Sequence, residues 1–212
     1  MPVNGDIRAE TVSTHWGVSS GQQNNRALLS AEKGGRKLKF RLLEATDIEV
    51  KVKKVKENGA ILLLYKTART DMDILDETIG PENWTNDYRE IKGNLYCGIG
   101  IRNEKGEFVW KWDCGIESRE DDEGNQKKGE ASDAFKRAGF RWGIGRELYS
   151  SPFIWVPSDK MNIKTGQNGK PKTVDNFVVE RIAYDSAGKI SGLAIWNTTK
   201  NIRAFSAQRN TA

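Results

Sequence analysis

Residues 129–143 read GEASDAFKRAGFRWG, and this stretch decides how the rest of the chain is interpreted. Its apolar residues recur at spacings of three and four, which predicts an amphipathic helix. The apolar stripe consists of Ala131, Ala134, Phe135, Ala138 and Trp142. Three basic residues fall outside that stripe, namely Lys136, Arg137 and Arg141. A solvated helix face and a phosphate-binding face both fit this pattern, because charged outer faces are common on helices.

A first hairpin precedes this helix and turns at Asn58-Gly59, a dipeptide typical of two-residue β-turns. With these two residues at the centre of the turn, Lys54 is expected to face Leu63. The first strand of the hairpin is rich in lysines, which are Lys51, Lys53, Lys54 and Lys56. Clustered positive charge of this kind is typical of surfaces that bind nucleic acids.

A second hairpin is predicted around a turn at residues 103–106, with Lys105-Gly106 as the central pair. The expected cross-strand pairs are Cys97 with Cys114, Ile99 with Trp112 and Ile101 with Trp110. This register gathers the apolar side chains on one face, and a slip of one residue would scatter them. The other face would be polar and thinly covered, with Gly98, Gly100, Arg102, Lys111 and Asp113.

The residues on the apolar face of this hairpin are expected to belong to the core. The start of the chain lacks a signal-peptide core, so Cys97 and Cys114 are predicted to be reduced thiols that pack as small apolar residues. Core packing is also predicted for Trp110, Trp112 and Trp142, because all three fall on apolar faces.

A short helix between the hairpins is predicted to begin at a capping box of Thr70 and Asp73 and to stop at Gly80-Pro81. Residues 84–91 then predict a strand, and residues 177–196 a C-terminal hairpin. The elements therefore follow the order β-β-α-β-β-β-α before that hairpin. Because strands and helices occur in blocks, we expect an α+β fold with one antiparallel β-sheet packed on a long basic helix.

Over about half of its length, residues 48–149, the chain resembles the single-strand annealing proteins of the Rad fifty-two superfamily, including phage annealases of the Sak type. The matching segments are residues 75–77, 79–80, 83–84, 96–101 and 106–115, and the helix motif that runs from Ala131 to Gly143. The resemblance lies in the order and spacing of these segments. The chain departs from the family pattern at Gly139 and Phe140, which follow the Lys-Arg-Ala sequence at residues 136–138. The next positive charge is therefore at Arg141.

The resemblance implies that Lys136 and Arg137 line a groove that holds single-stranded DNA. It also implies a basic contact at the entry to the first helix, where Arg69 or Lys66 is the nearest match. The full set of candidate DNA-binding residues is Lys136, Arg137, Arg141, Arg69, Lys66, Lys127, Lys128, Lys51, Lys53 and Lys54. Phosphate contacts of this kind hold the backbone and leave the base edges free to pair.

Composition sets the domain organisation that we expect. A chain of 212 residues is long enough for one domain, predicted at residues 36–197, with a proper core. Residues 1–35 are predicted to form a polar, partly flexible extension, and residues 198–212 a polar tail, because both are rich in small polar residues. A net charge of +5 favours a polyanionic partner. Within the loop at residues 117–123, five acidic side chains would repel DNA.

The predicted function is ATP-independent binding and annealing of single-stranded DNA in phage recombination, with no enzymatic activity and no cofactor or metal. The expected partners are single-stranded DNA and further copies of the chain in a ring or helical filament, with a phage exonuclease and a single-stranded DNA-binding protein as further candidates. No apolar run is long enough to span a membrane, and a cytoplasmic location in the bacterial host is expected.

Two alternatives remain open from the sequence. Asp47, Glu49 and Lys51 have the spacing of acidic and lysine residues found in metal-dependent nucleases. The other alternative is a single-stranded DNA-binding module of OB type that protects DNA without annealing it. The long helix that closes the predicted sheet argues against the five-stranded barrel of that module.

Overall fold

The computed structural model describes residues 38–116, 123–166 and 168–209. Its helices are α1 (Ala68–Ile79) and α2 (Glu123–Trp142), and its 3-10 turns are η1 (Ala45–Asp47), η2 (Pro81–Asn83), η3 (Arg146–Ser150) and η4 (Ser158–Lys160). The first strands are β1 (Ile48–Lys56), β2 (Gly59–Lys66), β3 (Trp84–Ile91), β4 (Asn94–Arg102) and β5 (Phe108–Cys114). The later strands are β6 (Ile154–Pro157), β7 (Lys164–Thr165), β8 (Pro171–Lys172), β9 (Phe177–Tyr184), β10 (Ile190–Asn197) and β11 (Ile202–Gln208).

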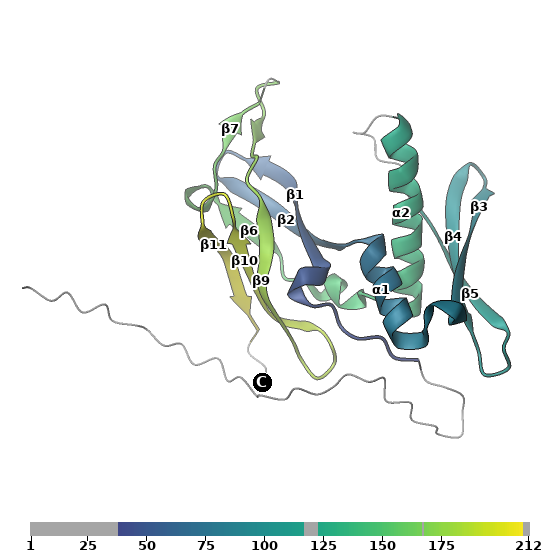
Figure 1. The fold of residues 1–212 in the computed structure, drawn as a ribbon. Helices are drawn as coiled ribbons and strands as arrows, with labels where there is room; N and C mark the ends of the chain where they lie inside the picture. Colours follow the sequence, from purple (N-terminus) through teal and green to yellow (C-terminus); the bar gives the residue numbers. More distant parts are fainter. Residues whose placement is uncertain (1–37, 117–122, 167, 210–212) are drawn as a thin grey trace, which may run out of the picture.

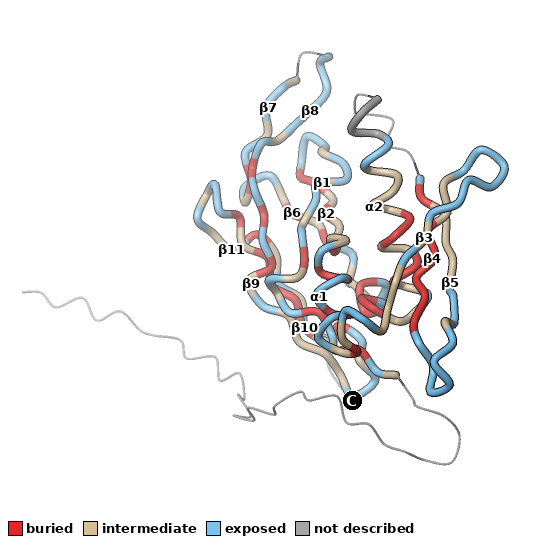
Figure 2. The backbone as a smooth tube through the Cα atoms, turned by 45° about the vertical axis from the view of Figure 1, so that its right-hand side comes forward, coloured by how far each residue is buried: buried red, intermediate tan, exposed pale blue. Residues whose placement is uncertain are grey.

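Two antiparallel sheets enclose the two helices, as Figure 1 shows. The larger sheet has six strands in the order β11-β10-β9-β1-β2-β6, and β11 also lies close to β6, so this sheet is a nearly closed barrel. The second sheet, which we call the small sheet, has three strands in the order β3-β4-β5 and packs on α2, and β7 and β8 form a separate two-stranded sheet. Figure 2 shows buried residues along β4 and α2 where they meet. None of the described helices is long and apolar enough to cross a membrane.

The α+β class predicted from the sequence is confirmed, but the prediction of one sheet is wrong. The predicted strands divide between two sheets, because α1 carries the chain from the end of β2 to the start of β3. In the larger sheet, strand β1 also pairs with β9 from the C-terminal hairpin, where Glu49 faces Val178. Local periodicity identifies a strand but does not say which distant strand lies beside it.

The prediction of a polar tail is also wrong over residues 202–208, which form the edge strand β11 beside β10. The low number of apolar residues explains why the strand is inconspicuous in the sequence. Ala204 is buried, Ile202 and Phe205 are half-buried, and the polar residues Arg203, Ser206 and Gln208 are exposed. An edge strand with one buried face needs few apolar residues. The predicted N-terminal extension at residues 1–35 and most of the acidic loop at 117–123 lie outside the described residues.

The first hairpin forms, but its predicted register is wrong. Lys56 pairs with Gly59, so the turn is Glu57-Asn58, and Lys54 faces Ile61 in place of Leu63. Gly59 is needed for a different reason, since a β-carbon there would collide with the carbonyl oxygen of Val156 in the neighbouring strand β6. The glycine therefore permits close approach of a third strand, as glycine in a strand often does.

The second hairpin is shifted by one residue from the predicted register. Gly98 faces Trp112 and Gly100 faces Trp110, while Cys97 faces Asp113. Indole rings fill the space above both glycines, because a β-carbon on Gly100 would lie 2.9 Å from Cε2 of Trp110. Packing of the large rings over glycine therefore decides the register, against the apolar pattern of the sequence.

This shift moves several side chains to the opposite face from the one predicted. Lys111 and Asp113 face α2, whereas Trp110 and Trp112 lie on the outer face, where Trp110 is 36% exposed. The prediction of core packing is thus wrong for both tryptophans. Cys97 and Cys114 are free thiols on opposite faces, and only Cys97 is buried.

Helix α2 packs as its apolar stripe predicts. Ala134, Phe135 and Ala138 are fully buried against the small sheet, and the indole Nε1 of Trp142 donates to the carbonyl oxygen of Ile99 at 2.9 Å. In α1 the predicted capping box is wrong. The cap is the side chain of Thr67, which accepts a hydrogen bond from the backbone N–H of residue 70 at 3.1 Å.

The observed register makes a testable prediction at Gly98. A β-carbon there would lie 2.5 Å from Cε2 of Trp112, so Gly98→Ala should displace the indole and lower the free energy of unfolding by about 1–3 kcal/mol. Urea denaturation measures the change. Gly129→Ala is the control, because a β-carbon there would meet no atom within 4 Å; residue 129 lies in α2, so this change should be neutral or stabilising. A neutral or stabilising effect at residue 98 would contradict the observed register.

Candidate nucleic-acid interface

Four basic side chains surround the C-terminal end of α2, and we call them the α2 cation cluster: Lys111, Arg137, Arg141 and Arg146. The Nζ of Lys111 donates to the carbonyl oxygen of Arg141 at 3.2 Å, and a guanidinium nitrogen of Arg146 donates to the same oxygen at 2.7 Å. Both bonds satisfy one of the carbonyl oxygens that a helix end leaves without a backbone partner. The negative end of the helix dipole further favours the positive charges.

Asp113 is the acidic side chain that pairs with this cluster. Its carboxylate lies 3.0 Å from Nε of Arg141 and 3.5 Å from Nε of Arg137. Burial raises the pKa of Asp113, but the hydrogen bond from Arg141 and the two positive charges outweigh that effect, so its pKa is lowered overall. One carboxylate against four cations leaves the cluster with excess positive charge.

The arginines of the cluster remain accessible to a ligand. The side chain of Arg137 is 41% exposed and that of Arg141 is 60% exposed, although both pair with Asp113. Lys111 is less available, because burial and the nearby charge of Arg146 lower its pKa and its ammonium lies 4.1 Å from the centre of the Trp142 ring. The cluster can therefore offer two or three cationic contacts to an anion.

An exposed aromatic ring adjoins the cluster. Tyr149 is 74% exposed, and its ring centre lies 5.0 Å from that of Phe140. Arg146 donates to the carbonyl oxygen of the same Phe140 at 2.6 Å, so a stacking surface and a cation meet at this residue. Single-stranded nucleic acid is commonly held by such a combination of rings and positive charge.

Of the residues predicted from the sequence, only Arg137 and Arg141 belong to this cluster. Lys136 lies outside the cluster: its Nζ is 3.9 Å from the carboxylate of Asp133, and its side chain is 19% exposed. Lys127 and Lys128 are exposed, but they lie about 20 Å from Arg141 along the helix. The structure therefore does not bring all the basic residues of α2 onto one face.

The remaining candidates are distributed over other elements. Lys51, Lys53 and Lys54 are exposed on β1 in the barrel-like sheet, and the ammonium of the first lies 3.4 Å from Glu49. Arg69 is exposed on the first turn of α1. Lys66 contradicts the prediction, because its side chain is only 1% exposed and pairs with the buried Asp71. A strand of DNA on the surface cannot reach the ammonium of Lys66.

Two members of the cluster, Lys111 and Arg146, were missed by the sequence analysis. Lys111 was assigned to the opposite face by the wrong register of the second hairpin. Arg146 follows the end of α2 by four residues, and a basic residue near a helix C-terminus is a recognisable signal for contact with its last carbonyls.

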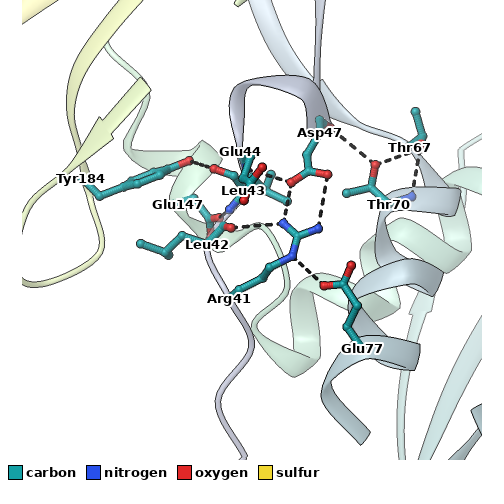
Figure 3. Close-up of polar contacts among 10 residues, drawn as sticks. All are labelled: Arg41, Leu42, Leu43, Glu44, Asp47, Thr67, Thr70, Glu77, Glu147 and Tyr184. Carbon is teal, nitrogen blue, oxygen red and sulfur yellow. Dashed lines mark hydrogen bonds and ion pairs between the residues drawn. The ribbon is translucent and has the colours of Figure 1, made fainter. Parts of the chain in front are cut away.

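Asp47, a candidate for a nuclease site, has a structural role, as Figure 3 shows. Its carboxylate accepts hydrogen bonds from the guanidinium of Arg41 and, at 2.8 Å, from the backbone N–H of Glu44. Arg41 also donates to Glu77 of α1 at 2.8 Å. These contacts fix the chain before β1 against α1. Within the described ranges, no group of three or more His, Cys, Asp and Glu side chains has the arrangement of a metal site.

The same segment is fixed on its other side by two further hydrogen bonds, also drawn in Figure 3. The backbone N–H of Leu43 donates to Glu147 at 2.7 Å, and the hydroxyl of Tyr184 donates to the carbonyl oxygen of Leu43 at 2.7 Å. Residues 41–47 thus connect α1, η3 and β9, which belong to different layers of the fold.

The ion pair of Asp47 predicts a change in stability at acid pH. Burial raises the pKa of Asp47, but the hydrogen bonds from Arg41 and Glu44 outweigh it and lower the pKa below 3.8. The pair therefore contributes stability above pH 3.8, which is lost as the pH falls through the lower, folded-state pKa. Asp47→Asn should lower the free energy of unfolding by about 1–3 kcal/mol at pH 7 and by less at pH 2–3. Urea denaturation at several pH values measures this, and an equal loss at every pH would contradict it.

Comparisons of the chain with protein-family models, curated proteins and solved structures found no match. The resemblance to the single-strand annealing proteins therefore remains a prediction. Any functional assignment rests on the positions and charges of the residues described above.

Proposed function

We propose that this protein binds single-stranded DNA and anneals complementary strands without ATP. The observation that carries the proposal is the α2 cation cluster, in which Asp113 pairs with Arg137 and Arg141, while Lys111 and Arg146 donate to the carbonyl oxygen of Arg141. The exposed ring of Tyr149 beside it supports the same ligand. Contacts to phosphate are independent of sequence, as a protein that pairs arbitrary complementary strands requires.

Annealing needs no chemical step, because pairing of two complementary strands is downhill once they meet. A protein that neutralises the phosphates lowers the repulsion between the strands. One subunit offers only a few such contacts, so we further propose that several copies act together on one strand and raise affinity through effective concentration.

The decisive test is the annealing of two complementary oligonucleotides in EDTA without nucleotide. The purified protein should accelerate annealing and leave both strands intact. Binding without acceleration would support the alternative of a protective single-stranded DNA-binding protein. Cleavage that depends on magnesium and disappears in Asp47→Asn would support the nuclease alternative and refute the proposal.

Assembly is tested separately by mass photometry, with and without single-stranded DNA. We expect species several times heavier than the 23.8 kDa protomer. A monomer under both conditions would contradict the proposal that neighbouring copies share one strand, even if DNA still bound.

A further inference from the structure

Three aromatic side chains form a row along β5 on the face of the small sheet that points away from α2. This aromatic ladder consists of Phe108, Trp110 and Trp112. The ring centres are 6.0 Å apart between the first two and 5.7 Å apart between the two tryptophans. No described helix or strand covers this face in Figure 1.

The rings present their faces because β4 has glycines beneath them. A β-carbon on Gly98 would lie 2.5, 2.6 and 2.7 Å from three consecutive atoms of the Trp112 ring. Such nearly equal distances place the face of the ring, and not its edge, over the glycine. Gly100 has the same relation to Trp110, at 2.9 to 3.0 Å. The outer faces of the indoles are thereby directed away from the sheet.

Arginines occupy both ends of the ladder. The guanidinium of Arg89 lies 4.4 Å from the centre of the Trp112 ring, and that of Arg102 lies 4.8 Å from the centre of Phe108. Within the described part of the chain, no cation lies over the middle ring, Trp110, which is 36% exposed. A guanidinium stacked on a ring keeps N–H donors for an anion, although Arg89 also pairs with Asp87 at 3.0 Å.

We propose that the aromatic ladder is a second site for single-stranded DNA, at which a base stacks on Trp110 and the flanking arginines contact phosphates. A flat aromatic face between two cations matches the alternation of base and phosphate along a single strand. Stacking uses the face of a base and leaves its hydrogen-bonding edge open, so it is compatible with annealing. This inference rests on the proposed ligand, but not on the α2 cation cluster, which lies on the other face of the sheet.

The test compares two substitutions that both keep the space over Gly100 filled. Trp110→Leu removes the aromatic face, whereas Trp110→Phe retains one. Fluorescence anisotropy measures binding of an oligothymidylate and of an abasic oligonucleotide of equal length. We expect Trp110→Leu to weaken oligothymidylate binding about tenfold and to leave abasic binding unchanged. Trp110→Phe should retain most of the affinity.

Other outcomes separate this inference from the proposed function. If the wild-type protein binds oligothymidylate and Trp110→Leu binds it equally well, the ladder is not a stacking site, while the proposed function is unaffected. An equal loss on both ligands would also overturn the inference, because a stacking site depends on bases. If Trp110→Leu dissociates an oligomer without this base-dependent loss, the face is an interface between copies. Failure of the wild-type protein to bind either ligand would refute both proposals.

Discussion

Lys66→Met alone is expected to lower the free energy of unfolding by about 3–5 kcal/mol. The ammonium of Lys66 pairs with the carboxylate of Asp71, and the two side chains are 1% and 0% exposed. The lysine also donates to the carbonyl oxygen of Lys136 at 3.1 Å and lies 4.1 Å from the centre of the Phe140 ring. It therefore joins β2, α1 and α2, and its removal leaves a buried carboxylate without its cation.

The double variant Lys66→Met with Asp71→Leu separates loss of the pair from loss of packing. Replacing a buried ion pair by apolar residues of similar size is often neutral or stabilising. We therefore expect the double variant to lie within about 1 kcal/mol of the wild type or above it. Urea denaturation of both variants, with Lys189→Met at an exposed position as control, measures the difference. Equal destabilisation by the single and double changes would show that packing, not the buried charge, dominates.

The pair also predicts a pH dependence. Burial raises the pKa of Asp71 from 3.8 to about 6, although the charge and hydrogen bond of Lys66 oppose the rise. A raised carboxyl pKa means that the folded state holds more protons than the unfolded state between pH 3.8 and about 6. The contribution of this group to stability is therefore fully present below pH 3.8 and falls as the pH rises through that window. In Asp71→Leu with Lys66→Met this contribution should be absent.

The second large effect is expected at the α2 cation cluster. Arg137→Gln with Arg141→Gln removes two arginines whose side chains are 41% and 60% exposed. Each phosphate contact to a single strand contributes about 0.7 to the slope of log K against log salt. Loss of two contacts should reduce that slope by about 1.4 and weaken binding about 25-fold at 0.1 M salt. Titration of a labelled oligonucleotide at several salt concentrations measures both quantities.

Asp113→Asn provides the opposing variant on the same surface. The carboxylate that pairs with both arginines is lost, so the affinity for DNA and the salt slope should rise. Lys189→Gln, an exposed change outside the cluster, is the neutral control. If the arginine changes and the control weaken binding equally, the cluster is not the binding surface, and net charge alone accounts for the affinity.

Much of the local structure could be predicted from the sequence. The spacing of Ala134, Phe135 and Ala138 predicted the buried stripe of α2, and Gly80-Pro81 predicted the end of α1. The strand at residues 84–91 and the C-terminal hairpin were also predicted correctly. These features depend on helix and strand periodicity and on turn residues, which act over a few positions of the chain.

The candidate site could be predicted only in part. Arg137 and Arg141 were identified because they lie on one helix. Lys111 joins them through the observed cross-strand register, and the predicted register differed from it by one residue. The error arose because the apolar pattern favours one face for isoleucines and tryptophans together, whereas the rings fit only over Gly98 and Gly100. The space that a side chain finds on the partner strand depends on which residue lies opposite, and this is decided by the tertiary structure.

The sequence by itself determined the α+β class, the order of elements through α2 and the presence of Arg137 and Arg141 on that helix. Only the tertiary structure decided that the strands divide between a barrel-like sheet and a small sheet, that Lys66 is buried, and that Trp110 faces outward. The physical reason is the range of the interactions. Periodicity and capping are set by neighbours in the chain, whereas strand partners, buried ion pairs and the covering of a sheet face depend on residues that are distant in sequence.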